Sequence, residues 1–541
     1  MGSEMCIRDS PEPSINSVRV RNPAGSCGAY VDMFERRLSR RKVITRSSTA
    51  LGAAAVLAAC GQQGSEGGQT SASGSAVIDS GVTSIDPANF PEGPLAVIDP
   101  ATIPRGEEID FGPAPEVPDG PLSPEVAAAV SLLYGQPVRG DLTDEQLEAL
   151  ATIGASQDAR LGWVIADHIR VFTAIAGSEG VSRDRLVEIN DQLESAASQL
   201  TGLELPQFLS WNPLTNSLIA WDIPAPPDYL SMKRNIFTPV EPAWEPLMTD
   251  NSVLDWRIVS WGGVLIDAQP FGETEGFCNC IPATDNPTTQ AAADATWLDP
   301  DDIVFGVVIN GEARAYPRQI MEVREMVNDT LGGRNFGMPY CTLCGSAQVW
   351  FTDNLPGGIE RPILRTSGLL SRSNKVMYDL VSQSIFDTFL GTADSGALLD
   401  EGIALVGHTV VTSTWGAWVA QHPNTTVLTE DLARGQDFDF RNGRDANGPI
   451  FPVGNVDPRL AIQEDILGVT QTNGRPLAIH VNSALSAIER GEIVVIDDLR
   501  VVRSGDGLLA FDSDGNAITA HQAFWFAWSQ FHPTTDLWPN V

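Results

Sequence analysis

The sequence predicts an α+β protein, in which an N-terminal helical segment precedes a mainly β domain. Three observations support this fold class. Residue types that commonly begin and end helices occur at helix-length intervals within residues 123–203. The run 302–346 has the apolar pattern of a strand, a helix and a second strand that ends in cysteines. A shorter copy of this pattern follows residue 465, so we expect two degenerate repeats, each with strands and one helix.

The composition limits the classes of partner. The chain has 541 residues, of which 34 are Lys or Arg and 69 are Asp or Glu, and its net charge is −35. This length exceeds a single core, so several domains are expected. Binding to nucleic acid requires a basic patch, and we therefore expect no nucleic-acid partner. An acidic, Lys-poor surface fits a salty external medium, and a genome that favours Arg codons is the alternative explanation.

The first sixty residues have the order of parts of an export signal. Residues 1–32 show no helical or strand period, and we interpret them as a non-native or unstructured leader. Within residues 33–60, the sequence SRRKVI at 39–44 resembles the twin-arginine export motif. The apolar run at 50–59 is too short to span a bilayer. The sequence LAAC at 57–60 resembles a lipobox.

This signal predicts where the protein is located. We expect cleavage before Cys60 and lipidation of its thiol. The protein would then be exported and anchored to the membrane on the periplasmic or extracellular side. Residues 61–122 are rich in Gly, Ser, Pro and acidic residues without a period, and they predict a disordered tether.

Residues 123–203 predict a bundle of three or four helices. Thr143 and Gln146 have the spacing of a capping box. One helix is expected to start at Ser156 and stop at Gly177, and another to run from Ser182 to Gly202. We expect the histidine within this bundle, His168, to be structural rather than a ligand.

Residues 204–270 predict a loop-rich bridge that is dense in Trp and Pro. It carries Trp211, Trp221, Trp244, Trp256 and Trp261. Exposed tryptophans can mark a binding surface, but we favour the interpretation that these residues join one domain to the next.

The two repeats occupy residues 271–435 and 436–541. In the first, a strand is expected from Ile303 to Tyr316, followed by a helix that Pro317 opens. The pattern Trp-x-x-Trp-x-x-x-His-Pro occurs in both repeats, and a Thr pair follows each copy. We interpret these copies, with His422 and His532, as packing elements rather than catalytic ones.

Several motifs within the repeats suggest a family. They include Trp261-Gly262-Gly263-Val264, Ile281-Pro282-Ala283-Thr284-Asp285-Asn286-Pro287, Gly311-Glu312-Ala313-Arg314-Ala315-Tyr316-Pro317, Val327-Asn328-Asp329, Tyr340-Cys341-Thr342-Leu343-Cys344-Gly345-Ser346 and Met377-Tyr378-Asp379. In this order they resemble the domain of unknown function 3179 family, over about residues 255–538. The resemblance implies an architecture rather than an activity. Two positions depart from the family pattern, because Arg324 stands where a His is typical and Phe386 where a Trp is usual.

Four cysteines of the mature chain suggest chemistry. Cys341 and Cys344 form a Cys-x-x-Cys-Gly knuckle, and Cys278 and Cys280 supply a second pair. Four thiolates suit one zinc, iron or copper ion, in a structural or a redox role, and this is the favoured prediction. Structural disulfides that join Cys278 to Cys341 and Cys280 to Cys344, or the reverse, are the first alternative. A redox dithiol at Cys341 and Cys344 is the second.

Polar residues in the family-like motifs complete the candidate site. Asp285, Arg314, Asn328 and Asp329 are candidates to line a pocket with the cysteines, and a buried Arg–carboxylate pair with an Asx-type turn is the alternative. The sequence has no Gly-x-Ser-x-Gly elbow, phosphate-binding loop or His-Glu-x-x-His motif. The favoured function is therefore metal binding by an exported lipoprotein. A non-catalytic binding or scaffold module and a thiol–disulfide oxidoreductase are the alternatives.

Overall fold

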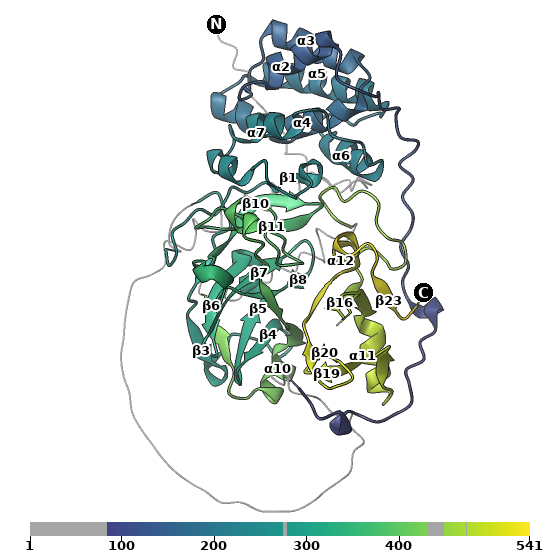
Figure 1. The fold of residues 1–541 in the computed structure, drawn as a ribbon, viewed down its shortest axis with the longest axis vertical. Helices are drawn as coiled ribbons and strands as arrows, with labels where there is room; N and C mark the ends of the chain where they lie inside the picture. Colours follow the sequence, from purple (N-terminus) through teal and green to yellow (C-terminus); the bar gives the residue numbers. More distant parts are fainter. Residues whose placement is uncertain (1–83, 274–277, 431–447, 472, 541) are drawn as a thin grey trace, which may run out of the picture.

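The computed structural model describes residues 84–273, 278–430, 448–471 and 473–540 (Figure 1). The predicted leader, the export signal with Cys60, and the first part of the predicted tether lie outside these residues. No helix in the described ranges is long and apolar enough to cross a membrane.

A helical part stands at one end of the molecule (Figure 1). Its helices are α2 (Pro124–Tyr134), α3 (Asp144–Ala155), α4 (Gly162–Glu179), α5 (Arg183–Thr201), α6 (Trp211–Ala220) and α7 (Tyr229–Phe237). The capping box at Thr143 is present, and Ser182 and Gly202 cap α5 as predicted. The helix expected to start at Ser156 begins instead at Gly162, because a 3₁₀ turn capped by Asp158 comes first. The helices α6 and α7 lie in the segment predicted as a loop-rich bridge.

His168 belongs to the core of the helical part. Its side chain is buried, and its Nδ1 lies 3.1 Å from the hydroxyl of Tyr134. Burial lowers the pKa of His168 to about 4, so the ring is neutral at physiological pH. These contacts fit the structural role expected for this histidine.

Tryptophans of residues 204–270 join the helical part to the β region. The indole of Trp244 is fully buried and donates a hydrogen bond to the carbonyl of Ser367, 2.7 Å away. The guanidinium of Arg170, on α4, lies 4.4 Å from the ring centre of Trp211 and 5.5 Å from that of Phe451. The interpretation of these tryptophans as links between domains agrees with these contacts.

The structure differs from the predicted tether over residues 84–122. This segment, called the strap below, runs in extended form over the second repeat and on to the helical part (Figure 1). Ser84 pairs with Asn516 and Leu95 with Ile493 as isolated β-bridges. Phe90 and Ile103 are buried. Composition alone missed this, because the strap has no core of its own and buries only single apolar side chains, such as Phe90 and Ile103, against another part of the chain.

Over the residues that the structure describes, the β region forms five small sheets in a propeller-like ring. The first repeat has one sheet in the order β14 (Val411–Thr414), β4 (Ile303–Ile309), β5 (Glu312–Pro317), β15 (Thr426–Leu428) and β3 (Thr289–Ala291). A second sheet has the order β13 (Val406–His408), β9 (Val349–Phe351), β7 (Arg334–Cys341), β6 (Met326–Leu331) and β2 (Thr284–Asp285), with β8 (Ser346–Ala347) paired to β7. A third has the order β1 (Val259–Trp261), β10 (Leu364–Ser371), β11 (Asn374–Asp379) and β12 (Ile385–Phe386).

The second repeat forms the remaining two sheets. One has the order β22 (Ala520–Phe524), β16 (Asp465–Thr470), β17 (Pro476–His480) and β23 (Asp536–Trp538). The other has the order β18 (Val494–Ile496), β19 (Leu499–Ser504), β20 (Gly507–Phe511) and β21 (Ala517–Ile518). The helices of the β region are α8 (Arg318–Arg324), α9 (Gly396–Asp400), α10 (Trp415–Gln421), α11 (Val481–Glu489) and α12 (Trp525–Phe531).

The two repeats share one strand order. In each, an antiparallel pair (β4 and β5, or β16 and β17) is flanked by an antiparallel strand (β14 or β22) and a parallel strand (β15 or β23). Each repeat has two helices in equivalent places, α8 and α10 or α11 and α12, rather than the one that was predicted. The strand expected from Ile303 to Tyr316 is a hairpin, because Asn310 and Gly311 adopt the positive φ of a tight turn.

The echoed residues hold each repeat together in the same way. An ideal Cβ at Gly306 would lie 2.1 Å from the ring of Trp418, and one at Gly468 would lie 2.2 Å from that of Trp528. Each indole donates a hydrogen bond to a threonine hydroxyl, at 3.0 Å to Thr425 and 2.9 Å to Thr535. The rings of His422 and His532 lie 4.1 and 4.0 Å from these indoles. The interpretation of these segments as packing elements therefore agrees with the structure.

Candidate functional site

The four cysteines form two local pairs. Cys278 is bonded to Cys280, and Cys341 to Cys344. The predicted disulfides between the two segments are therefore wrong. Cys341 is 2 % exposed and Cys344 is fully buried, so the second pair lacks the exposure that a thiol oxidoreductase requires.

The predicted four-sulfur metal site is not assembled. Among the described residues, no group of three or more His, Cys, Asp or Glu side chains is placed to hold a metal ion. The atoms beside the Cys341–Cys344 disulfide are oxygens, with Oδ1 of Asn374 2.8 Å and the carbonyl of Ser373 3.7 Å from Sγ of Cys344. Hard oxygen donors do not fit the soft-ligand set that the sequence predicted.

Asp285 and Asn328, two of the predicted pocket residues, belong to one buried network. The two terminal guanidinium nitrogens of Arg365, Nη1 and Nη2, donate to the carboxylate of Asp285 from β10, at 2.8 and 2.5 Å. The side-chain amide of Asn328 donates to the same carboxylate at 2.9 Å. Asp267 lies 3.5 Å from Arg365, and burial raises the pKa of its carboxyl. This network ties β2, β6 and β10 together.

Arg314 and Asp329, the other two, form a second network on the opposite face of β6. Arg314 contacts the carboxylate of Asp329 at 2.6 Å, and the hydroxyl of Tyr316 donates to that carboxylate at 2.7 Å. Burial raises the pKa of Tyr316 well above its usual value, so the phenol keeps its proton and remains a donor. The structure thus favours buried Arg–carboxylate pairs over a shared pocket.

Arg324, where the family pattern has a His, is a structural residue here. Its guanidinium binds Glu430 through two hydrogen bonds, of 3.1 and 2.8 Å. Both side chains are largely buried. This pair joins the end of α8 to the segment that follows β15.

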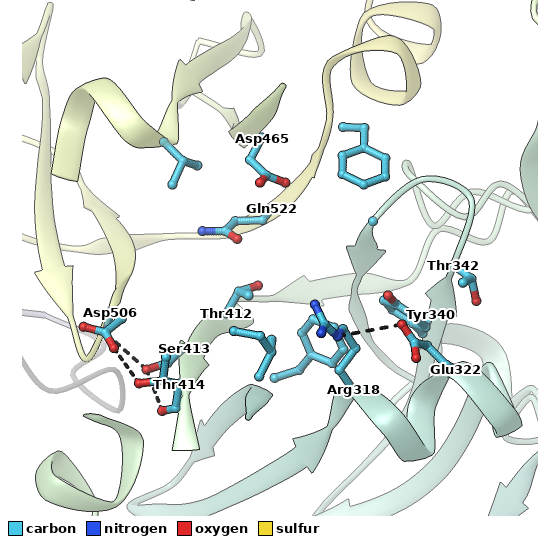
Figure 2. A pocket seen from close by; sticks show the side chains of 15 residues that line it. Arg318, Glu322, Tyr340, Thr342, Thr412, Ser413, Thr414, Asp465, Asp506 and Gln522 are labelled. Carbon is cyan, nitrogen blue, oxygen red and sulfur yellow. Dashed lines mark hydrogen bonds and ion pairs between the residues drawn. The ribbon is translucent and has the colours of Figure 1, made fainter. Parts of the chain in front are cut away.

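A cleft of about 200 Å³ lies between the two repeats. Figure 2 shows its labelled side chains, with Arg318, Glu322, Tyr340 and Thr342 on one side and Asp506, Ser413 and Thr414 on the other. Asp465 and Gln522 come from the second repeat and face the space between them. Apolar lining comes from Ile303, Phe305, Val481 and Phe524. None of the eight predicted site residues is part of this lining.

The cleft is built from equivalent positions of the two repeats. When Gly306 is aligned with Gly468, the strand registers fix the other equivalences. Four equivalent pairs then line the cleft with both of their members: Ile303 and Asp465, Arg318 and Val481, Thr412 and Gln522, Thr414 and Phe524. The cleft therefore lies between equivalent positions of the two repeats.

The Cys341–Cys344 loop forms part of the cleft wall. Tyr340, Thr342 and Gly345 all line the cleft. The carbonyl of Cys344 accepts a hydrogen bond of 2.8 Å from the backbone N–H of Phe524, so this loop also joins the two repeats. The disulfide thus holds a loop that shapes the cleft, although its sulfur atoms are buried.

A comparison with models of protein families finds a match within the β region. Residues 278–502 match the model of a family described as "Protein of unknown function (DUF3179)". The resemblance predicted from the sequence is thereby confirmed. No curated protein and no solved structure matches the chain.

The DUF3179 match and the cleft overlap only in part. The matched residues include Arg318, the cysteine loop and Asp465, but end before Asp506, Gln522 and Phe524. Sequence reasoning missed the cleft because its residues are scattered over both repeats. An alignment of the two copies was the available signal, since it pairs Thr414 with Phe524 directly before the echoed tryptophans.

Proposed function

We propose that the β region is a binding module that holds a small polar molecule in the cleft between the repeats. One observation carries this proposal, namely that both members of four equivalent pairs line one cleft. Ligand sites are typically concave, with mainly apolar walls and a few convergent polar groups. Here Arg318 and Gln522 supply such groups, and neither of these side chains is fully buried.

The size of the cleft limits the ligand. Its volume of about 200 Å³ is below the roughly 300–1,000 Å³ of pockets that take drug-sized molecules. A ligand of metabolite size fits this space. The hydroxyl of Thr414, held 2.5 Å from Asp506, and Thr412 offer hydrogen bonds along the wall.

The proposal includes export and a lipid anchor at Cys60. The order of parts in residues 33–60 supports it, and the two cysteine pairs at disulfide distance are suited to an oxidising compartment. Replacing Cys60 by Ser is expected to move the protein from the membrane fraction to the soluble fraction. Retention of the Cys60→Ser variant in the membrane would contradict the anchor.

Thermal unfolding of the full chain with a panel of small molecules tests the binding function. The panel contains amino acids, sugars, amines, carboxylates and nucleosides. A ligand present at a hundred times its Kd should stabilise the folded state by about 2.7 kcal/mol and raise Tm. We expect at least one class to do so.

A variant that fills the cleft is the control for location. Thr412→Trp places an indole in the cleft, whereas Thr470→Trp places one at the exposed end of β16. The ligand-dependent rise in Tm should disappear with Thr412→Trp and persist with Thr470→Trp. A rise that survives Thr412→Trp, or no rise with any class, would overturn the binding function.

A further inference from the structure

We infer that the Cys278–Cys280 disulfide is a site of thiol–disulfide exchange with pairs of thiols in other proteins or peptides. Cys278 carries the sulfur that the partner attacks, and Asp267 supplies the proton that Cys280 takes up when the bond opens. This function is separate from ligand binding in the cleft between the repeats. It follows from the unequal exposure of the two cysteines and from the carboxyl group beside one of them.

The first step is the asymmetry of this disulfide. Only Asn279 separates the two cysteines, so the bond closes a very small loop. Cys278 is partly exposed and Asn279 is exposed, whereas Cys280 is only 4 % exposed. The rate at which a thiolate opens a disulfide depends on access to the sulfur that it attacks. A partner thiolate is therefore expected to attack Cys278, with Cys280 as the leaving group.

The second step is how the backbone holds Cys280 beside Asp267. Leu265 and Cys280 form an isolated parallel bridge, and the N–H of Leu265 donates to the carbonyl of Asn279 at 2.8 Å. Asp267 follows on the same segment as Leu265, and its Oδ2 accepts a hydrogen bond of 2.8 Å from the N–H of Ala283. Its Oδ1 lies 3.8 Å from Sγ of Cys280. The carboxyl group is thereby fixed next to the buried sulfur.

The third step is the state of this carboxyl group. Asp267 is 1 % exposed, and burial raises the pKa of its carboxyl. Among the charged groups that face it, Arg365, with Nε 3.5 Å from Oδ2, opposes this rise, and Asp285 adds to it. A raised pKa brings a carboxyl group closer to neutral pH, where it transfers protons more efficiently. Asp267 is thus suited to exchange a proton with Cys280.

The exchange balances in atoms and electrons. A thiolate of the partner attacks Sγ of Cys278, the Cys278–Cys280 bond breaks, and its electron pair goes to Sγ of Cys280. Asp267 gives its proton to this sulfur and is protonated again from solvent. The second thiolate of the partner then attacks the partner sulfur bound to Cys278, which leaves as a thiolate and takes a proton from solvent. The partner dithiol is thereby oxidised by two electrons to a disulfide, and the cysteine pair is reduced to two thiols.

The reverse steps restore the disulfide. A disulfide compound of low molecular weight is the oxidant, and it is reduced to two thiols as the Cys278–Cys280 bond forms again. In this direction Asp267 accepts the proton of the Cys280 thiol, so that the thiolate can attack. The same carboxyl group therefore acts as an acid in one direction and as a base in the other.

The Cys341–Cys344 disulfide lacks this arrangement. Both of its cysteines are buried. Sγ of Cys344 lies near the amide oxygen of Asn374 and the carbonyl of Ser373, and neither group exchanges a proton near neutral pH. We therefore expect the two disulfides to differ in reactivity, and Cys341–Cys344 is the internal reference for the experiments.

Reaction of the full chain with reduced glutathione tests which disulfide exchanges. The folded protein is incubated with glutathione for increasing times, free thiols are alkylated, and the modified cysteines are identified by mass spectrometry. Cys278 and Cys280 should become alkylated about tenfold or more faster than Cys341 and Cys344. Reaction of Cys341 and Cys344 at an equal or higher rate would overturn the inference, as would resistance of both disulfides until the protein unfolds.

Asp267→Asn tests the proton transfer. This change keeps the shape of the side chain but removes its acid–base function. The rate measured is the oxidation of a reduced peptide with two cysteines, with oxidised glutathione as oxidant and the full chain as catalyst. Asp267→Asn should lower this rate about tenfold or more. Asp514→Asn, in an exposed turn, is the matched control and should leave the rate unchanged. Equal rates for the two variants would exclude Asp267 as the proton donor.

Single cysteine variants test the roles of the two sulfurs without a change at Asp267. Cys280→Ser leaves the thiol of Cys278, which should form a mixed disulfide with oxidised glutathione. Cys278→Ser leaves the buried thiol of Cys280, which should react about tenfold or more slowly. Circular dichroism checks that each variant folds. Similar rates for the two variants, or no mixed disulfide at Cys278, would contradict attack at Cys278.

Discussion

The two repeats agree where they pack and differ where they face the cleft. Gly306 and Gly468 make the same contact with a tryptophan, and each tryptophan makes the same hydrogen bond to a threonine. In contrast, all four equivalent pairs in the cleft consist of two different residue types. Packing requires the same residues in both copies, whereas the residues that line the cleft are suited to what occupies the space between the copies.

The repeats also differ in length, and the structure explains the difference. The strands β6, β7, β9 and β13 of the first repeat correspond in order to β18, β19, β20 and β21 of the second. Between β9 and β13 the first repeat has β10, β11 and β12, which pair with β1 to form a sheet beneath the helical part (Figure 1). This insertion brings in Arg365, the buried cation of the Asp285 network.

The largest effect is expected for this buried cation, which has no counterpart in the second repeat's sheets as described. Arg365→Met leaves the carboxylate of Asp285 buried without its ion pair, and should lower the free energy of unfolding by about 3–5 kcal/mol. Urea denaturation measures the loss. The double variant Arg365→Met with Asp285→Asn should recover most of it, since no charge then remains unpaired. A double variant as unstable as the single one would contradict the ion-pair explanation.

A smaller effect tests whether the two repeats are equivalent. Gly306→Ala and Gly468→Ala each place a methyl group against a tryptophan ring, and both should lower the free energy of unfolding by about 1–3 kcal/mol. Gly177→Ala, in α4, is the matched control, because a Cβ there meets nothing within 4 Å. This control should stabilise the protein by up to about 1 kcal/mol. Losses at Gly306 and Gly468 that differ by several kcal/mol would argue against equivalent packing.

The smallest effect concerns a position that holds Val411 in the first repeat and His521 in the second. Burial, together with a smaller effect of the nearby His532, lowers the pKa of His521 to about 3. An unfolded histidine has a pKa of about 6.5. Above pH 6.5 the His521 ring is neutral in both the folded and the unfolded state, so it does not make the free energy of unfolding depend on pH. Below pH 6.5 the unfolded state binds a proton first, so the free energy of unfolding falls as the pH drops towards 3.

His521→Val should therefore flatten the acid side of the stability profile. The slope should fall by up to about 1.4 kcal/mol per pH unit between pH 6 and pH 4. Denaturation at several pH values measures this slope. His168, whose pKa is also lowered by burial, remains in the variant and supplies a residual slope. An unchanged slope would mean that His521 does not titrate as its burial implies.

Much of the fold could be predicted because local rules decide it. Caps at Thr143 and Ser182 start helices as expected, and the echoed Trp and His-Pro segments mark equivalent helices. The turn at Asn310 and Gly311 was missed, although Asn-Gly is a strong hairpin signal. The apolar run from Ile303 to Tyr316 was interpreted as one strand, so the turn within it was not predicted.

The candidate site could not be predicted in the same way. The sequence placed four cysteines in one site, but each pair closes within its own segment. Asn328 and Asp329 are neighbours in sequence, yet alternation along β6 sends them to different networks. The cleft depends on how two sheets from distant parts of the chain face each other, and no local pattern contains that information.

The strap has a consequence for the order in which the protein is completed. Its first described residue, Ser84, pairs with Asn516, and Leu95 pairs with Ile493. Chains are synthesised and begin to fold from the N-terminus, so these partners emerge last. The segment nearest to the predicted export signal therefore reaches its final place only after the second repeat has formed. If the protein is exported already folded, the segment that follows the export signal would therefore have different neighbours in a fully folded chain and in an incompletely folded one.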